Sequence, residues 1–97
     1  MFLESELTFK LMNELANTVR KHDNLQLAVN LYKKALLSLK TRFKNNFMQQ
    51  RDTSKILINI ASTEFIRLNY TEACRYYEHA LCVLKTVCLD DFTKWID

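Results

Sequence analysis

Three cysteines and one histidine in the C-terminal part of this sequence are the residues best suited to metal binding or nucleophilic chemistry. Cys74, Cys82 and Cys88 fall on one expected helix and its end, and His79 precedes Cys82 by three residues. Residues three apart on a helix are neighbours and can share a metal ion. No second ligand pair has suitable spacing, since His22 lies far away in sequence. We therefore expect no metal and no cofactor, and we interpret the cysteines as small buried apolar side chains.

Catalysis by a cysteine nucleophile lacks the surrounding residues that it requires. No acid in evident reach would orient His79, and the sequence contains no glycine for a loop that stabilises an oxyanion. The absence of glycine also removes phosphate-binding loops and two-residue hairpin turns, which need a positive φ. The sequence predicts a protein without enzymatic activity and favours helices over strands.

Basic residues are concentrated in the middle third of the sequence. Residues 24–55 contain seven lysines and arginines and one acid, although the net charge of the whole chain is only +3. Such a cluster can neutralise phosphates or contact an acidic partner, and it is also typical of a solvated helix face. Nucleic acid is an alternative ligand here, but the interleaved aromatic residues of single-strand binders are missing. The predicted basic patch consists of Lys33, Lys34, Lys40, Arg42, Lys44 and Arg51.

The elements that must position these residues are predicted to be helices of a single domain. The chain has 97 residues, 48% hydrophobic and 26% charged, which is typical of one small globular domain. Apolar residues recur every three or four positions and predict helices at about residues 3–21, 24–43, 53–68 and 70–84. The spacing of Asp23 and Gln26 resembles a capping box, and a residue at 52–54 is expected to cap the third helix. Asp90 and Asp91 are expected to open a short, separate helix over residues 92–96.

The start of the sequence and its cysteines suggest a compartment. Met1, Phe2 and Leu3 are followed by an acid, unlike the basic and then apolar start of a secretory signal. Three cysteines without such a signal predict a reducing compartment, so we expect a cytoplasmic protein, with the nucleus or an organelle as alternatives. The longest apolar runs are about five residues, far below the roughly 20 that cross a bilayer, so no membrane insertion is expected.

An internal repeat relates the two halves of the chain at an offset of 45 residues. From Leu15 paired with Ile60 to Thr41 paired with Thr86, ten positions are identical, and most of them are small or aromatic. Among them are Ala16 with Ala61, Ala28 with Ala73, Tyr32 with Tyr77 and Ala35 with Ala80. Each half is predicted to be a helical hairpin that cannot bury its own apolar face, so stacking of the two hairpins explains the repetition.

These residues resemble two tetratricopeptide repeats over about residues 10–86. The small and aromatic pattern of that family's second helix is similar to Ala28, Tyr32 and Ala35 in the first half and to Ala73, Tyr77 and Ala80 in the second. The offset of 45 exceeds the family's period of about 34 residues, and the extra residues fall near 42–52. The resemblance implies two stacked hairpins with hairpin one at 3–44, a linker at 45–52, hairpin two at 53–88 and a C-terminal cap at 90–97.

The resemblance also implies a protein-binding groove lined by the first helix of each hairpin. The partner would be a peptide or a subunit of a larger complex, and the chain would act as a small adaptor or scaffold. A homodimer is an alternative, because so short a stack leaves apolar edges. The groove positions carried over from the family are Lys10, Asn13, Asn17, Arg20, Lys21, Lys55, Asn59, Ser62 and Phe65.

Two more specific interpretations stay open. Asn17 and Asn59 match the amides with which co-chaperone domains of this family hold the C-terminal carboxylate of a heat-shock chaperone, although this chain lacks several of the accompanying basic residues. Residues 14–39 also resemble the first two helices of a microtubule-interacting-and-trafficking domain, a three-helix bundle that binds C-terminal helices of ESCRT subunits. That interpretation leaves residues 70–84 without a role, although they repeat the first hairpin.

Overall fold

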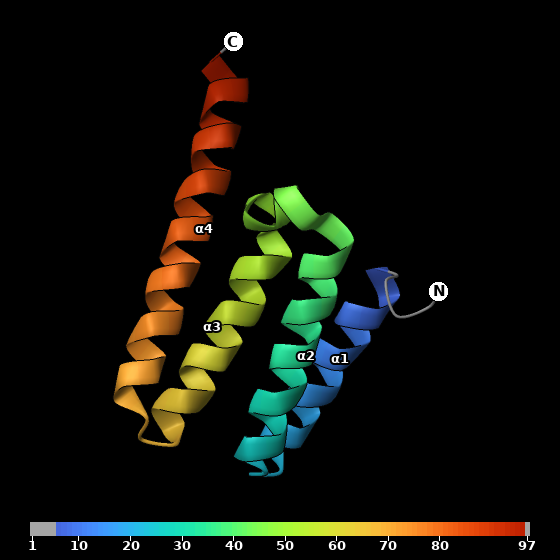
Figure 1. Cartoon of the computed structure of the whole chain (residues 1–97). Coiled ribbons are helices and arrows are strands. Elements are labelled where there is room, and N and C mark those ends of the chain that lie inside the picture. The colour runs from blue at the N-terminus through green and yellow to red at the C-terminus, as the bar shows by residue number, and fades with distance from the viewer. Residues whose placement is uncertain (1–5, 97) are drawn as a thin grey trace.

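Four α-helices in two antiparallel hairpins form the fold (Figure 1). The computed structural model describes the backbone of residues 6–96 and the side chains of residues 8–88. The first hairpin consists of α1 (Glu6–Lys21) and α2 (Leu25–Phe43), and the second of α3 (Arg51–Ile66) and α4 (Tyr70–Ile96); a 3-10 helix, η2 (Lys44–Gln49), connects them. Residues 6–96 contain no strand, and none of their helices could span a membrane. The predicted all-α hairpin fold is confirmed.

The main core lies between α1, α2 and α3 and uses positions that belong to the internal repeat. Ala16, Ala28 and Ala35 are fully buried, and their short side chains allow α1 and α2 to approach closely. Tyr32 of α2 and Ile60 of α3 are also fully buried in this cluster, so they join the second hairpin to the first. A smaller cluster closes the hairpin of α3 and α4 and consists of Leu57, Ala80, Val83 and Val87. Leu36 of α2 and Tyr76 of α4 pack against both clusters, so stacking and hairpin closure share these two side chains.

The two copies of the repeat form similar hairpins with different neighbours. Tyr32 has no exposed surface, whereas its counterpart Tyr77 is 43% exposed. Leu15 and its counterpart Ile60 differ in the opposite direction, with 52% and 0% exposed. Stacking buries one face of each hairpin, and the opposite face stays open because no further hairpin covers it in the described residues. The unlike exposure of equivalent residues follows from their place in a stack of two.

The turn between α1 and α2 differs from the expected capping box. Asn24 caps α2, because its Oδ1 accepts the backbone N–H of Leu27 at 3.4 Å. Asp23 instead occupies the turn with a φ of 64°, a left-handed conformation that Asp tolerates better than most residues. The Gln26 side chain donates to Asn30 Oδ1 rather than reaching back to Asp23. The predicted capping box of Asp23 and Gln26 is therefore wrong. The cap is Asn24, one residue later, and Gln26 bonds to Asn30 instead.

Two segments are more helical than the sequence suggested. The expected linker at 45–52 contains η2, and α3 begins at Arg51 without a side-chain cap, so the predicted cap at 52–54 is wrong. Thr53 Oγ1 instead donates to Phe47 O at 2.8 Å and ties η2 to α3. The separate terminal helix expected after Asp90 is also wrong, because α4 continues to Ile96. The sequence has no Gly or Pro to end α4, and Asp costs little inside a helix.

Candidate protein-interaction surfaces

The first helices of the two hairpins are joined by side-chain hydrogen bonds. Asn59 Nδ2 of α3 donates to Asn13 Oδ1 of α1 at 3.1 Å. Arg20 Nη1 of α1 donates to Ser62 Oγ of α3 at 2.9 Å and to Thr63 Oγ1 at 3.4 Å. These bonds link α1 to α3. We call the predicted groove residues the α1–α3 surface: Lys10, Asn13, Asn17, Arg20, Lys21, Lys55, Asn59, Ser62 and Phe65.

Both amides proposed for carboxylate binding have partners within the chain. Tyr32 donates its hydroxyl hydrogen to Asn17 Oδ1, and Asn59 donates to Asn13. A carboxylate only accepts hydrogen bonds, and an Asn amide carries two N–H donors. The bond to Asn13 uses one N–H of Asn59, and the bond from Tyr32 uses the oxygen of Asn17, so both amides have N–H groups that these bonds do not use. The internal bonds fix the orientation of the two amides and link the helices.

The remaining residues of the α1–α3 surface are accessible to a partner. Lys10, Lys21 and Lys55 are exposed, and their side chains add positive charge to α1 and α3. Phe65 is 55% exposed at the end of α3, and its ring meets the Tyr70 ring edge-on with centroids 5.3 Å apart. Tyr and Phe are enriched at the centres of protein interfaces. This surface thus combines three lysines with an aromatic pair at one end.

The buried Tyr32 ring lies near the Arg20 cation, and its hydroxyl bonds to Asn17. Burial raises the pKa of Tyr32 above its ordinary value of 10.0, while the nearby Arg20 charge lowers the pKa to a lesser extent and Glu14 raises it. The Arg20 guanidinium lies 5.9 Å from the centre of the Tyr32 ring. Because the folded state favours the protonated phenol, Tyr32 contributes stability below pH 10 that is lost as the pH rises through the higher folded-state pKa.

We predict that Tyr32→Phe flattens the loss of stability at alkaline pH. At neutral pH the variant loses the bond to Asn17 and about 1 kcal/mol of unfolding free energy. Between pH 8 and 11 it should lose less stability than the wild type, because the unfolded variant has no phenol at this position that ionises more readily than in the folded state. Urea titrations followed by circular dichroism at several pH values measure this difference. The exposed Tyr77→Phe variant is the control, and equal alkaline slopes for the wild type and Tyr32→Phe would contradict the assignment.

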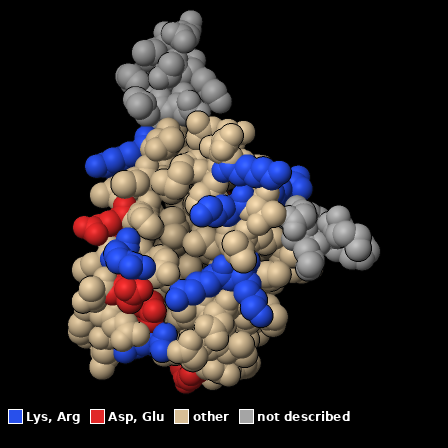
Figure 2. Space-filling view, in the orientation of Figure 1, with Lys and Arg blue, Asp and Glu red and all other residues tan. Residues whose placement is uncertain are grey.

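The predicted basic residues are all exposed and lie on α2, η2 and the first residue of α3. Figure 2 shows several Lys and Arg side chains over α2 and η2 with no acidic side chain among them, and further basic side chains next to acidic ones over α4 and the lower end of the molecule. Positive charge is therefore concentrated over α2 and η2 without being confined to them. Such a local concentration attracts anionic groups more strongly than the small net charge of +3 suggests.

An apolar pocket lies between α2 and α4 beside these cations, and the sequence did not indicate it. Its volume is about 390 Å³. One wall belongs to α2 and consists of Lys33, Leu36, Leu37 and Lys40; the opposite wall consists of Arg75, Tyr76 and His79 of α4. Phe47 and Met48 of η2 and Leu57 of α3 complete the lining. We call this site the α2–α4 pocket. The sequence shows the spacing of the α2 residues that line the pocket. It does not show that Phe47 and Met48 of η2 complete the lining.

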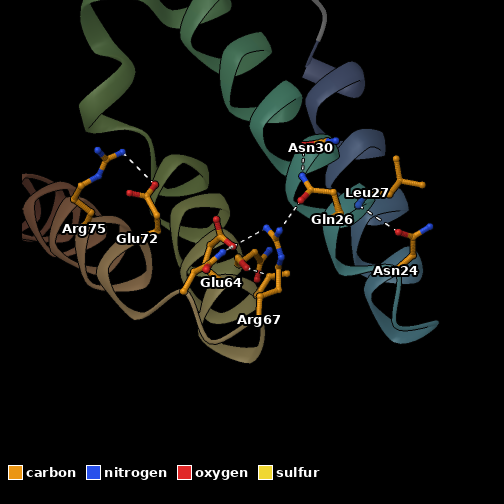
Figure 3. A network of polar contacts seen from close by, with 11 residues as sticks. Asn24, Gln26, Leu27, Asn30, Glu64, Arg67, Glu72 and Arg75 are labelled. Carbon is orange, nitrogen blue, oxygen red and sulfur yellow. Dashed lines mark hydrogen bonds and ion pairs between the residues drawn. The ribbon is translucent and has the colours of Figure 1, made fainter.

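A polar network connects the turn of the second hairpin to α2 (Figure 3). Glu64 is only 4% exposed, and its Oε1 accepts hydrogen bonds from Arg67 Nη1 at 2.8 Å and Asn69 Nδ2 at 3.1 Å. Arg67 also donates through Nη2 to Gln26 Oε1 of α2. Leu68 adopts a φ of 69°, which reverses the chain between α3 and α4. The network therefore fixes the turn and links the two hairpins.

The cysteines are not buried, so that part of the sequence interpretation is wrong. Cys74, Cys82 and Cys88 are free and exposed. The buried stripe of α4 passes through Ala73, Ala80, Val83 and Val87, and each cysteine lies beside it. Among the described residues, no group of three or more His, Cys, Asp and Glu could hold a metal ion.

All three thiols should react in the folded protein. Because each cysteine is exposed, Ellman's reagent should titrate three thiols per chain without denaturant, the same number as in guanidinium chloride. A lower count for the folded protein would mean that α4 is covered, either by another copy or by a different packing of the helices.

Two stacked helical hairpins, each built on the same small and aromatic positions, define this chain as a helical-repeat protein. Residues 53–92, which cover most of α3 and α4, match the tetratricopeptide repeat family. This match supports a tetratricopeptide-type repeat in the second hairpin, as the resemblance implied. Comparisons with curated proteins and with solved structures found no match. A repeat of this type supports a protein–protein interaction module with a protein partner.

Proposed function

We propose that this chain is a non-enzymatic adaptor that binds a segment of a partner protein along the α1–α3 surface. The hydrogen bonds that join α1 to α3 support the proposal, because Lys10, Lys21, Lys55 and Phe65 are exposed residues of these two helices. The lysines favour an acidic segment, and the aromatic ring supplies apolar contact area. The exposed, free cysteines are consistent with a reducing compartment, and we propose the cytoplasm.

Quantitative affinity purification with matched variants tests this function. A Lys55→Glu, Phe65→Ala double variant alters two exposed residues of the α1–α3 surface and leaves the core intact. Lys34→Glu on α2 is the control, since it reverses an exposed charge outside this surface. Partners that are lost with the double variant and kept with the control support the proposal. Retention of every partner by the double variant would contradict it.

Self-association through the open ends of the stack is a second candidate. Inside the chain, Tyr32 of the first hairpin packs against the second hairpin, in which Ile56 and Ile60 are almost fully buried. The equivalent residues on the outer faces are exposed: Leu11 by 58%, Leu15 by 52%, Tyr77 by 43% and Leu81 by 52%. We propose that the α4 face of one copy packs on the α1 face of another, which continues the internal stacking.

Complementation between two single variants tests this head-to-tail contact. Leu15→Glu blocks the α1 face and Leu81→Glu blocks the α4 face, and both residues are exposed, so folding is retained. Each variant alone should stay monomeric in light scattering while the mass of the wild type rises with concentration. An equimolar mixture keeps one intact face on each copy and should form a dimer and nothing larger. A wild type that stays monomeric at all concentrations would overturn this candidate.

The two alternatives from the sequence receive less support. In a microtubule-interacting-and-trafficking domain α1, α2 and α3 would form the whole bundle; here these helices share the main core, but α3 also pairs with α4 as a second hairpin. The clamp for a chaperone tail needs several basic residues beside Asn17 and Asn59 that this chain lacks. Titration of a heat-shock chaperone's C-terminal peptide into ¹⁵N-labelled protein tests the clamp, because shifts at Asn17 and Asn59 would restore it.

A further inference from the structure

We propose that the α2–α4 pocket binds an acidic amphipathic helix of a partner protein, with carboxylates at both ends of the pocket and an apolar side chain inserted between them. No residue of α1 lines this pocket, so the proposal is independent of binding at the α1–α3 surface. Three features of the pocket support the proposal: an apolar floor, a basic rim and the spacing of the cations along α2.

The floor of the pocket is apolar and accessible. Leu57 is nearly buried at its base, while Leu37 is 64% exposed and Met48 is 40% exposed at its edge. A volume of about 390 Å³ lies within the range of sites that enclose a small ligand or a few side chains. Exposed leucine and methionine beside such a floor gain stability when a partner's apolar side chain removes them from water.

The rim of the pocket is basic on both walls. Lys33 and Lys40 lie on α2, Arg75 and His79 lie on α4, and no lining residue is acidic. Lys33 and Lys40 form no ion pair with the described side chains, whereas Arg75 lies 3.5 Å from Glu72. The charged groups of Lys33 and Arg75 both lie near the Tyr76 ring, at 6.0 and 5.8 Å from its centre. The rim thus holds positive charge that is available to a negative partner.

The spacing of the lysines selects the kind of anion. Lys33 and Lys40 are seven residues apart on α2, which corresponds to about 10 Å along a helix. A fatty acid has a single carboxylate and could pair with only one end of this row. A partner helix with two acids seven residues apart reaches both lysines, since its own rise is the same.

The pocket residues of α2 have the spacing expected of a surface that binds another helix. Lys33, Leu36, Leu37 and Lys40 follow the spacing i, i+3, i+4 and i+7, so one stripe presents two leucines between two cations. A helix that docks in a groove is recognised through the same spacing of its own anchors. The complementary stripe is therefore Glu, two apolar residues and Glu at these positions, laid between α2 and α4.

A designed peptide tests the proposal directly. The probe is an acetylated and amidated 15-residue alanine-based helix with two Glu seven residues apart and a Leu–Phe pair between them. Titration into ¹⁵N-labelled protein should shift amides of residues 33–40 and 75–79. Reversal of both lysines, Lys33→Glu with Lys40→Glu, should weaken binding about tenfold or more. Lys34→Glu, an exposed residue on the same helix outside the pocket, should change it less than about twofold.

A charge swap distinguishes specific pairing from general attraction. The same peptide with Lys in place of both Glu should bind the reversed variant better than it binds the wild type. Replacement of the Leu–Phe pair by alanines should abolish binding. The proposal is overturned if the original peptide shifts only α1 and α3, if it binds all variants equally, or if dodecanoate shifts the pocket and the peptide does not. The last result would make the pocket a site for a fatty acid.

Discussion

Ile60→Ala should destabilise the protein far more than Leu15→Ala, although the two residues are equivalent in the internal repeat. Ile60 has no exposed surface and packs with Tyr32 and Leu39 where the hairpins meet. Its truncation leaves a cavity at that contact and should cost about 2–4 kcal/mol of unfolding free energy. Leu15 is 52% exposed, so its truncation should cost less than about 1 kcal/mol.

Urea denaturation of both variants measures this difference. For a domain of this size, the loss at Ile60 corresponds to a decrease in Tm of about 10 °C or more. If Ile60→Ala does not fold, Ile60→Val removes a single methylene and should still cost about 0.5–1.5 kcal/mol. Equal losses at Leu15 and Ile60 would mean that the hairpins do not stack through α3, and the basis for a repeat architecture would be lost.

The sequence alone predicts the hairpins well because the repeat contains two independent copies of the same information. Identical small residues at Ala28 and Ala73, and at Ala35 and Ala80, mark where helices must approach each other, and all four are buried. The order of the helices then follows from the period of the apolar residues. The family match at residues 53–92 falls on the second copy.

Burial of the outer residues could not be predicted from the same pattern. Tyr32 and Tyr77 occupy equivalent positions, but only Tyr32 has another hairpin against it. The cysteines of α4 lie one position away from its buried stripe, and periodicity cannot distinguish such flanking positions from the stripe when a helix is covered on one side only. Tertiary neighbours therefore decided the exposure of Cys74, Cys82 and Cys88.

The candidate sites were predicted only in part, because polar side chains can serve a ligand or the fold. Asn13, Asn59 and Arg20, which the resemblance implied as groove residues, form hydrogen bonds between the two hairpins. No sequence pattern states which of these roles a given amide has. The α2–α4 pocket depends on η2, a segment that the sequence suggested to be a linker. The spacing of Lys33 and Lys40 was therefore the only feature of the sequence that could have indicated the pocket.

Removal of Arg67 should be the second large perturbation, because it leaves a buried carboxylate without its cation. Glu64 is 4% exposed and would retain only the Asn69 donor. Arg67→Ala also removes the bond to Gln26 that links the second hairpin to α2. Arg67 is itself only 25% exposed at its side chain, so solvent screens the pair weakly. We expect a loss of about 2–3 kcal/mol in unfolding free energy.

Arg75 provides a matched control for the charge and the spacing. It pairs with Glu72 at the same i, i+3 separation, but at 3.5 Å and with 63% of its side chain exposed, so Arg75→Ala should cost less than about 1 kcal/mol. A double-mutant cycle of Arg67→Ala with Glu64→Ala isolates the pair, since the double variant no longer buries an unpaired carboxylate. Its loss should be smaller than the sum of the two single losses by at least about 1 kcal/mol. Additive losses, or equal effects at Arg67 and Arg75, would show that the turn after α3 does not depend on this network. In that case the backbone hydrogen bonds of the turn, from Leu68 N to Phe65 O and from Asn69 N to Glu64 O, would hold Leu68 at its φ of 69°.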